Sequence, residues 1–330
     1  MKLLDIEDIK KAKERIFKFV NNTPILTSSL LDNYLGHEIY FKAECMQKIG
    51  AFKARGAFNT MSWLIENKIN PKHIVANSSG NHAQAVAWAA SQFNIPSTIY
   101  MPDYSSKIKI QATKAYGANV VLCESRAIAD EKVKQAAEEK NTYMIPPFNH
   151  EQVIAGQGTA VYDALIELGN VDAVFAPCGG GGLLSGSLVA TRALSPNAKV
   201  FGAEPLNAND AAQSIRLNSI QKLPSVPNTL ADGAMTMSVG NITFEYLKKL
   251  DNIYEIEESS IIYWTQWLTN LLKVQVEPTS AMSLEAACTW LSGQSTKKRV
   301  LVVLSGGNID QETLLKIWNN NRLGEIPKLK

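Results

Sequence analysis

A run of four consecutive glycines is the most informative feature of the sequence. Gly179, Gly180, Gly181 and Gly182 follow the apolar run AVFAP at 173–177 and precede LLSGSLVATRAL, which has helical character. A strand, a glycine loop and a helix N-terminus in that order favour a phosphate, because exposed N–H groups and the positive end of the helix attract an anion. Glycines are also used where backbones pack closely. The run therefore predicts a phosphate site or, alternatively, a tight packing turn.

The residues around these glycines exclude the two commonest nucleotide loops. The segment does not read GxxxxGK followed by Ser or Thr, so a nucleoside-triphosphate P-loop is disfavoured. A GxGxxG pattern starting at Gly179 meets Leu184 at its third glycine, and one starting at Gly180 meets Ser185. The dinucleotide fingerprint is therefore only weakly matched. A phosphate on a smaller cofactor fits the loop better.

A lysine in the segment GAFKARGA, residues 50–57, is the candidate nucleophile. Lys53 stands next to the aromatic Phe52 and among small residues. Burial in such a setting would lower the pKa of the amine and leave it free to attack an electrophile. An ordinary surface lysine is the alternative, because most lysines are exposed.

Short β-rich runs alternate with helical patterns along the whole chain. Continuous apolar runs such as VLVVL at 300–304 are typical of strands buried on both faces of a parallel sheet. The alternation predicts an α/β fold with helices on both faces. We expect strands at 38–41, 74–77, 97–101, 119–123, 173–176, 199–203 and 299–304. We expect helices at 6–20, 83–93, 107–116, 130–140, 152–168 and 280–291.

Three of these strands end in small, polar, glycine-bearing turns. HIVAN leads into the turn at 78–82, AVFAP into the turn at 178–182, and VLVVL into the turn at 305–308. In open α/β sheets, ligands bind beyond the carboxyl ends of the strands. The three turns are therefore expected to surround one ligand.

The composition excludes several other classes of protein. The chain has 33 basic and 31 acidic residues, so its net charge of +2 gives no basis for binding nucleic acid. No apolar run approaches the ~20 residues of a membrane span, and the N-terminal segment lacks a signal-peptide core. Four separated cysteines without a CxxC pattern indicate reduced thiols in a cytoplasmic protein. They are Cys45, Cys123, Cys178 and Cys288.

Six motifs together resemble a known family. They are GAFKARGAFN, SSGNHAQAVA, PCGGGGLLSG, GAEP, EPTSA and LSGGN, in that order between residues 50 and 308. Their order and spacing resemble the fold-type II pyridoxal-phosphate enzymes, and most closely the threonine/serine dehydratase and serine racemase family. The resemblance implies a two-domain α/β protein with open twisted sheets, like the tryptophan synthase β subunit. It implies a large domain of residues 1–71 and 148–330 that binds the cofactor, and a small inserted domain of residues 72–147 on the mobile side of the cleft.

The resemblance also assigns roles around pyridoxal 5′-phosphate. It implies that Lys53 forms a Schiff base with the cofactor and that Phe52 stacks on the pyridine ring. It places Asn81 at the 3-hydroxyl oxygen and Ser305 at the pyridine nitrogen. A neutral hydroxyl does not enforce protonation of that nitrogen, and this suits elimination of a β-leaving group.

Two turns are implied to hold the anionic groups. The phosphate is expected on the backbone amides of Gly179, Gly180, Gly181, Gly182 and Leu183. The substrate carboxylate is expected on the turn and helix N-terminus formed by Ser78, Ser79, Gly80, Asn81 and His82.

The implied reaction is that of an ammonia-lyase. L-Threonine or L-serine would be converted through an external aldimine and an aminoacrylate to a 2-oxo acid and ammonia, with Lys53 taking the Cα proton. Alternatives are a serine racemase or a 3-hydroxyaspartate dehydratase that uses the same site with Ser79 as a second acid/base. Racemases of the family carry serine at this position, and some hydroxyaspartate dehydratases also have the double serine. Ser79 could instead only bind the carboxylate. Ala51 departs from the serine that many members have there.

The segment from Gly202 to Asp210 resembles the divalent-cation site of the family. Carboxylates of Glu204 and Asp210 and the carbonyl of Ala208 would supply oxygen ligands for Mg²⁺, Mn²⁺ or Ca²⁺. An acidic loop without an ion is the alternative. The resemblance further implies a homodimer, and the short stretch after Asn308 leaves no room for a C-terminal regulatory domain.

Overall fold

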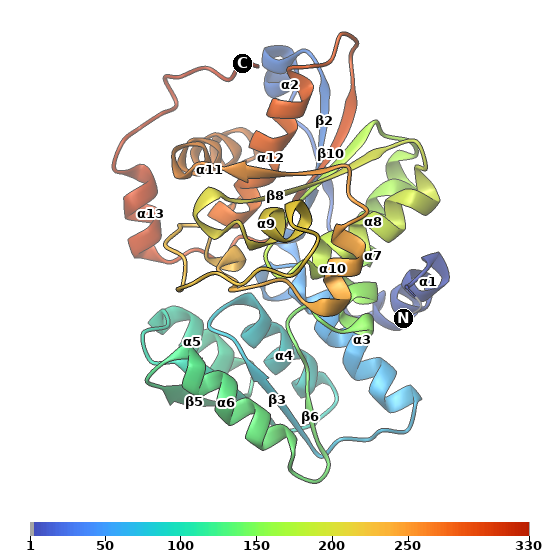
Figure 1. The fold of residues 1–330 in the computed structure, drawn as a ribbon, viewed down its shortest axis with the longest axis vertical. Helices are drawn as coiled ribbons and strands as arrows, with labels where there is room; N and C mark the ends of the chain where they lie inside the picture. Colours follow the sequence, from blue (N-terminus) through green and yellow to red (C-terminus); the bar gives the residue numbers. More distant parts are fainter. Residues whose placement is uncertain (1–2, 330) are drawn as a thin grey trace.

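The strands of the chain form two separate sheets, as the alternating pattern predicts. The computed structural model describes residues 3–329. The four-stranded sheet lies in the lower half of Figure 1 and the six-stranded sheet lies above it. In spatial order, the six-stranded sheet consists of β1 (Ile25–Leu26), β2 (Glu38–Ala43), β10 (Arg299–Leu304), β7 (Ala173–Pro177), β8 (Lys199–Pro205) and β9 (Asn252–Ile256). The four-stranded sheet consists of β5 (Asn119–Cys123), β4 (Ser97–Pro102), β3 (His73–Asn77) and β6 (Thr142–Met144).

The pairings in both sheets are parallel except where the two-residue β1 meets β2. Parallel strands are covered on both faces, which explains their continuous apolar runs. All seven strands expected from the sequence are present. The expected α/β fold class is confirmed. The domain boundaries at 71–72 and 147–148 stay a prediction.

Helices cover both faces of the six-stranded sheet. Leu301 and Val303 of β10 point to the face covered by α7 (Glu151–Leu168) and α8 (Gly182–Leu194). Val300 and Val302 point to the other face, covered by α11 (Glu258–Leu272) and α12 (Pro278–Leu291). The alternation of side chains along β10 therefore places the sheet between two layers of helices.

The four-stranded sheet is covered in the same way. Ile74 and Ala76 of β3 pack toward α3 (Lys53–Glu66) and α4 (Asn81–Gln92), whereas Val75 packs against α6 (Arg126–Ala137). The remaining helices are α1 (Ile6–Ile16), α2 (Ser29–Leu35), α5 (Lys107–Ala115), α9 (Asp210–Arg216), α10 (Asn241–Leu247) and α13 (Gln311–Trp318). Single 3₁₀ turns are η1 (Glu44–Met46), η2 (Lys48–Gly50), η3 (Leu206–Ala208) and η4 (Asp232–Ala234). Among residues 3–329, no helix is long and apolar enough to cross a membrane.

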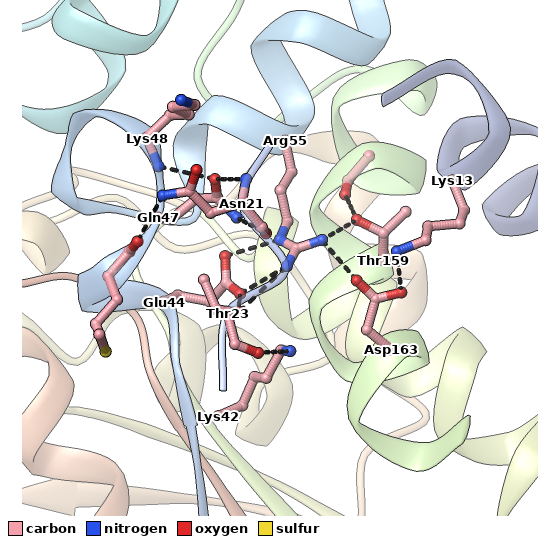
Figure 2. Close-up of polar contacts among 12 residues, drawn as sticks. Lys13, Asn21, Thr23, Lys42, Glu44, Gln47, Lys48, Arg55, Thr159 and Asp163 are labelled. Atoms are coloured by element: carbon pink, nitrogen blue, oxygen red, sulfur yellow. Dashed lines mark hydrogen bonds and ion pairs between the residues drawn. The ribbon is translucent and has the colours of Figure 1, made fainter. Parts of the chain in front are cut away.

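A buried ionic cluster fixes the start of α3, and Figure 2 shows it. The guanidinium of Arg55 is fully buried and donates to both carboxylate oxygens of Glu44, at 2.7 and 2.8 Å. It also donates to Asp163 of α7 at 3.0 Å. Although burial opposes ionisation, Arg55 holds the pKa of Glu44 below its usual value. The cluster therefore ties the first turn of α3 to the end of β2 and to α7.

Candidate active site

One cavity brings together the residues that the sequence assigned to the cofactor and to the substrate carboxylate. All three glycine-bearing turns contribute to its lining, because the turns follow the carboxyl ends of β3, β7 and β10. The roles of these residues stay predictions. The predicted site residues in the lining are Phe52, Lys53, Ser78, Ser79, Gly80, Asn81, His82, Gly179, Gly180, Gly181, Gly182, Leu183 and Ser305.

Lys53 is the first residue of α3, and its amine lies in this cavity. Burial lowers its pKa to about 8, against a smaller opposing effect from Glu277. The Nζ atom donates to the carbonyl of Pro147 at 2.7 Å and lies 5.0 Å from the centre of the Phe52 ring. A sizeable fraction of this amine is therefore neutral near pH 8 and able to attack an aldehyde.

The glycine loop combines a left-handed residue, close packing and a helix N-terminus that no side chain caps. Gly181 has a φ of +89° and directly precedes α8, and no side chain caps that helix. A Cβ atom at Gly180 would lie 2.2 Å from the Phe148 ring, and one at Gly182 would lie 2.5 Å from Oε1 of Gln157. The first N–H groups of a helix have no partner within the helix. The close packing of the glycines is therefore present, and the uncapped start of α8 is compatible with the phosphate site, which stays a prediction.

Asn81 is held at the first turn of α4 by two residues from distant parts of the chain. Its Nδ2 donates to the two carboxylate oxygens of Glu277, at 3.0 and 3.2 Å. Its Oδ1 accepts from Nδ2 of Asn308 at 2.8 Å. Burial raises the pKa of Glu277 to about 7, and the charge of Asp232 adds to this shift. The side chain of Asn81 is thereby fixed at the wall of the cavity.

The other residues of the 78–82 turn differ in their contacts. Oγ of Ser78 accepts from the N–H of Gly80 at 3.2 Å. Within residues 3–329, no hydrogen bond engages the hydroxyl of Ser79, which lines the cavity. His82 is buried, and its ring nitrogen lies 2.8 Å from the carbonyl of Ile145. Burial and the nearby Lys53 lower the pKa of His82 to about 3, so its ring is neutral and supports the turn.

Ser305 is buried at the end of β10 and pairs with another hydroxyl. Its Oγ lies 3.0 Å from Oγ of Ser280, which in turn donates to the carbonyl of Gly306. The pair leaves Ser305 as a neutral hydrogen-bonding group in the cavity lining. Ala51 forms an isolated antiparallel bridge with Gly306 and so helps to fix this turn.

The predicted cation ligands lie outside this cavity. Glu204 is buried and accepts from the N–H groups of Ala211 and Ala212, at 3.2 and 2.7 Å. Asp210 is also buried, and its Oδ2 has no hydrogen-bond partner. Burial raises the pKa of both carboxyls. In the described part of the chain, no group of three or more His, Cys, Asp or Glu side chains could hold a metal. A cation held by Glu204, Asp210 and the carbonyl of Ala208 therefore stays a prediction.

Three charged residues of the cavity lining were not identified from the sequence. Glu277 lies in the EPTSA motif, but its contact with Asn81 joins residues 196 positions apart. Asp232 pairs with Lys109 of α5, which is 123 positions away. Arg126 begins α6, whose N-cap is Ser125. The predicted helix began at 130, so the cap signal of Ser125 was the missed clue.

Comparisons with known proteins find relatives that match nearly the whole chain. The family model described as pyridoxal-phosphate dependent enzyme matches residues 16–306. The L-threo-3-hydroxyaspartate ammonia-lyase of Saccharomyces cerevisiae is 43% identical over 92% of this chain and 93% of its own. The serine racemase of Schizosaccharomyces pombe is 42% identical over 93% of this chain and 94% of its own. The crystal structure of a T.th. threonine deaminase superposes with a TM-score of 0.87 at 40% identity, covering 93% of this chain and 99% of that one.

Proposed function

The chain belongs to the fold-type II pyridoxal-phosphate-dependent enzymes, and from this premise we propose that it is an ammonia-lyase of small β-hydroxy L-amino acids. L-Threonine and L-serine are the proposed substrates, and a 2-oxo acid and ammonia are the products. The observation that carries the proposal is Lys53, whose amine has a pKa of about 8 and shares one cavity with an uncapped glycine loop.

The residues of the cavity fit the cofactor. Lys53 would hold its aldehyde carbon, the amides around Gly181 would hold its phosphate, and Asn81 and Ser305 would bind its ring. Bound pyridoxal phosphate supplies an electron-withdrawing system that stabilises negative charge at the substrate Cα. The neutral Ser305–Ser280 hydroxyl pair would leave the ring nitrogen without an anionic partner.

The protein's own groups account for the remaining requirements of elimination. The N-terminus of α4, with Ser78 and Gly80 before it, favours the α-carboxylate of the substrate. The amine of Lys53 can take a proton from Cα, because its lowered pKa leaves it neutral in a useful pH range. The β-hydroxyl leaves as water, and the ammonium form of Lys53 can supply the proton that this departure needs.

Racemisation is a second candidate, and Ser79 is the observation that favours it. Its hydroxyl lines the cavity without a hydrogen-bond partner in the described residues, so it is free to exchange a proton with a substrate. Relatives named serine racemase support this candidate. Relatives named for 3-hydroxyaspartate support dehydration of that substrate at the same site. A cytoplasmic homodimer is part of the proposal.

The test uses purified protein reconstituted with pyridoxal phosphate. The wild type is expected to show a near-visible cofactor absorption band and to form 2-oxo acid from L-serine or L-threonine. K53A should lose the lysine-linked band, while S79A should stop formation of D-serine and spare elimination. A protein that binds no cofactor, or a K53A variant with unchanged absorption and activity, contradicts the proposed function.

A further inference from the structure

Arg126 is placed where it can contact a substrate. It is the first residue of α6 and lines the active-site cavity together with Asn77, Ser78 and Ser79. A small neighbouring cavity is lined by the same four residues. Arg126 therefore belongs to the wall that also carries the turn proposed for the α-carboxylate.

Arg126 differs from the other arginines of the described chain in its lack of polar partners. No hydrogen bond or ion pair engages it within residues 3–329. Each of the other six arginines forms an ion pair with a carboxylate. They are Arg15, Arg55, Arg192, Arg216, Arg299 and Arg322.

The acidic residues near Arg126 are engaged elsewhere. Asp130, one turn further along α6, accepts a hydrogen bond from Nδ2 of Asn77. Of the acids that line the cavity, Asp232 pairs with Lys109 and Glu277 binds Asn81. Oδ1 of Asn77 is a buried acceptor without a donor. The wall thus offers an unpaired cationic donor and an unpaired acceptor, beside the N-terminus of α6.

We propose that Arg126 binds a carboxylate on the β-carbon of the substrate, which makes a 3-hydroxy dicarboxylic amino acid preferred over the L-serine and L-threonine proposed above. The proposal rests on the ammonia-lyase function proposed above. The α-carboxylate is assigned to the N-terminus of α4, so a monocarboxylic substrate such as serine leaves Arg126 unpaired. A second carboxylate matches the planar fork of a guanidinium, which binds carboxylates through two parallel hydrogen bonds.

The first test compares two substrates on the cofactor-loaded enzyme. In R126Q, kcat/KM for L-threo-3-hydroxyaspartate is expected to fall about 100-fold, the scale of one lost charge-assisted contact. The fall for L-serine is expected to be at least ~10-fold smaller. K132Q is the matched control, because Lys132 is exposed on the same helix and loses the same charge. It should leave the ratio of the two kcat/KM values unchanged.

The second test measures the binding of amino acids that have no β-hydroxyl and so cannot be dehydrated. L-Aspartate carries the β-carboxylate but no β-hydroxyl, and L-alanine lacks both, so calorimetry on the loaded enzyme compares their affinities. R126Q should weaken L-aspartate binding relative to L-alanine about 100-fold, and R126K should weaken it less because the charge remains.

Each outcome decides between the proposals. Equal losses for both substrates and both ligands, or no loss for either, overturn the assignment of Arg126. A wild-type enzyme that turns over neither hydroxy amino acid contradicts the ammonia-lyase function, and the aspartate and alanine affinities still decide the role of Arg126. A normal cofactor band and unfolding temperature in R126Q show that the variant is folded.

Discussion

Replacement of Glu44 with glutamine is expected to destabilise the protein by about 3 kcal/mol, the lower end of the cost of breaking a buried ion pair. Glu44 is fully buried and accepts from Arg55 at 2.7 and 2.8 Å and from the Thr23 hydroxyl at 2.5 Å. Glutamine keeps the shape but removes the charge and turns an N–H group toward the guanidinium. The lower end applies because Asp163 still pairs with Arg55 at 3.0 Å.

The assay is urea unfolding of the cofactor-loaded protein, with the free energy of unfolding extrapolated to water. The matched control is E66Q, because Glu66 forms an exposed pair with Arg15 at 2.6 Å, and such a pair contributes at most about 1 kcal/mol. The double variant E44L/R55M removes both charges and is expected to be less destabilised than E44Q.

The reasoning on the buried cluster is refuted if E44Q costs no more than E66Q. It is also refuted if E44L/R55M is less stable than E44Q, since the uncompensated charge would then not be the source of the loss. A pH series adds an independent check. The pKa of Glu44 is lower in the folded than in the unfolded state, so its contribution is complete above the unfolded value of about 4.5. That contribution is lost as the pH falls further, and E44Q should lack this part of the acid dependence.

Three further predictions concern the cavity. Amine-selective labelling of Lys53 in the cofactor-free protein should rise with a midpoint near pH 8, and a midpoint near 10.5 would contradict its burial. E277Q should move that midpoint to lower pH, because the charge of Glu277 raises the pKa of Lys53. An unchanged midpoint would show that Glu277 has no effect on this pKa. G180A should weaken pyridoxal-phosphate binding at least ~10-fold in a fluorescence titration. The new Cβ atom would lie 2.2 Å from the Phe148 ring, so the ring or the loop must move. Unchanged affinity would mean that the loop adapts freely.

The parts of the fold that the sequence predicts are those with a strong local pattern. β10 and β7 are buried on both faces, so their continuous apolar runs identify them. β1, β6 and β9 were not predicted. β1 has two residues and β6 has three, which is too short for a periodic pattern, and β9 has polar residues within its five.

The candidate site divides in the same way. The turns that bear glycine follow directly from strands, so their common cavity could be expected from the sequence. The contacts of Glu277 and Asp232 depend on tertiary packing between remote segments, and no local spacing predicts them. The missing ion pair of Arg126 within residues 3–329 is likewise visible only in the folded chain.

The most direct test of the central claim is to identify the residue that holds the cofactor. The loaded protein is treated with borohydride, digested and analysed by mass spectrometry. The account predicts that the reduced cofactor is attached to Lys53 and that K53A carries none. Attachment to another lysine, or no attached cofactor in a protein that retains activity, would contradict the account.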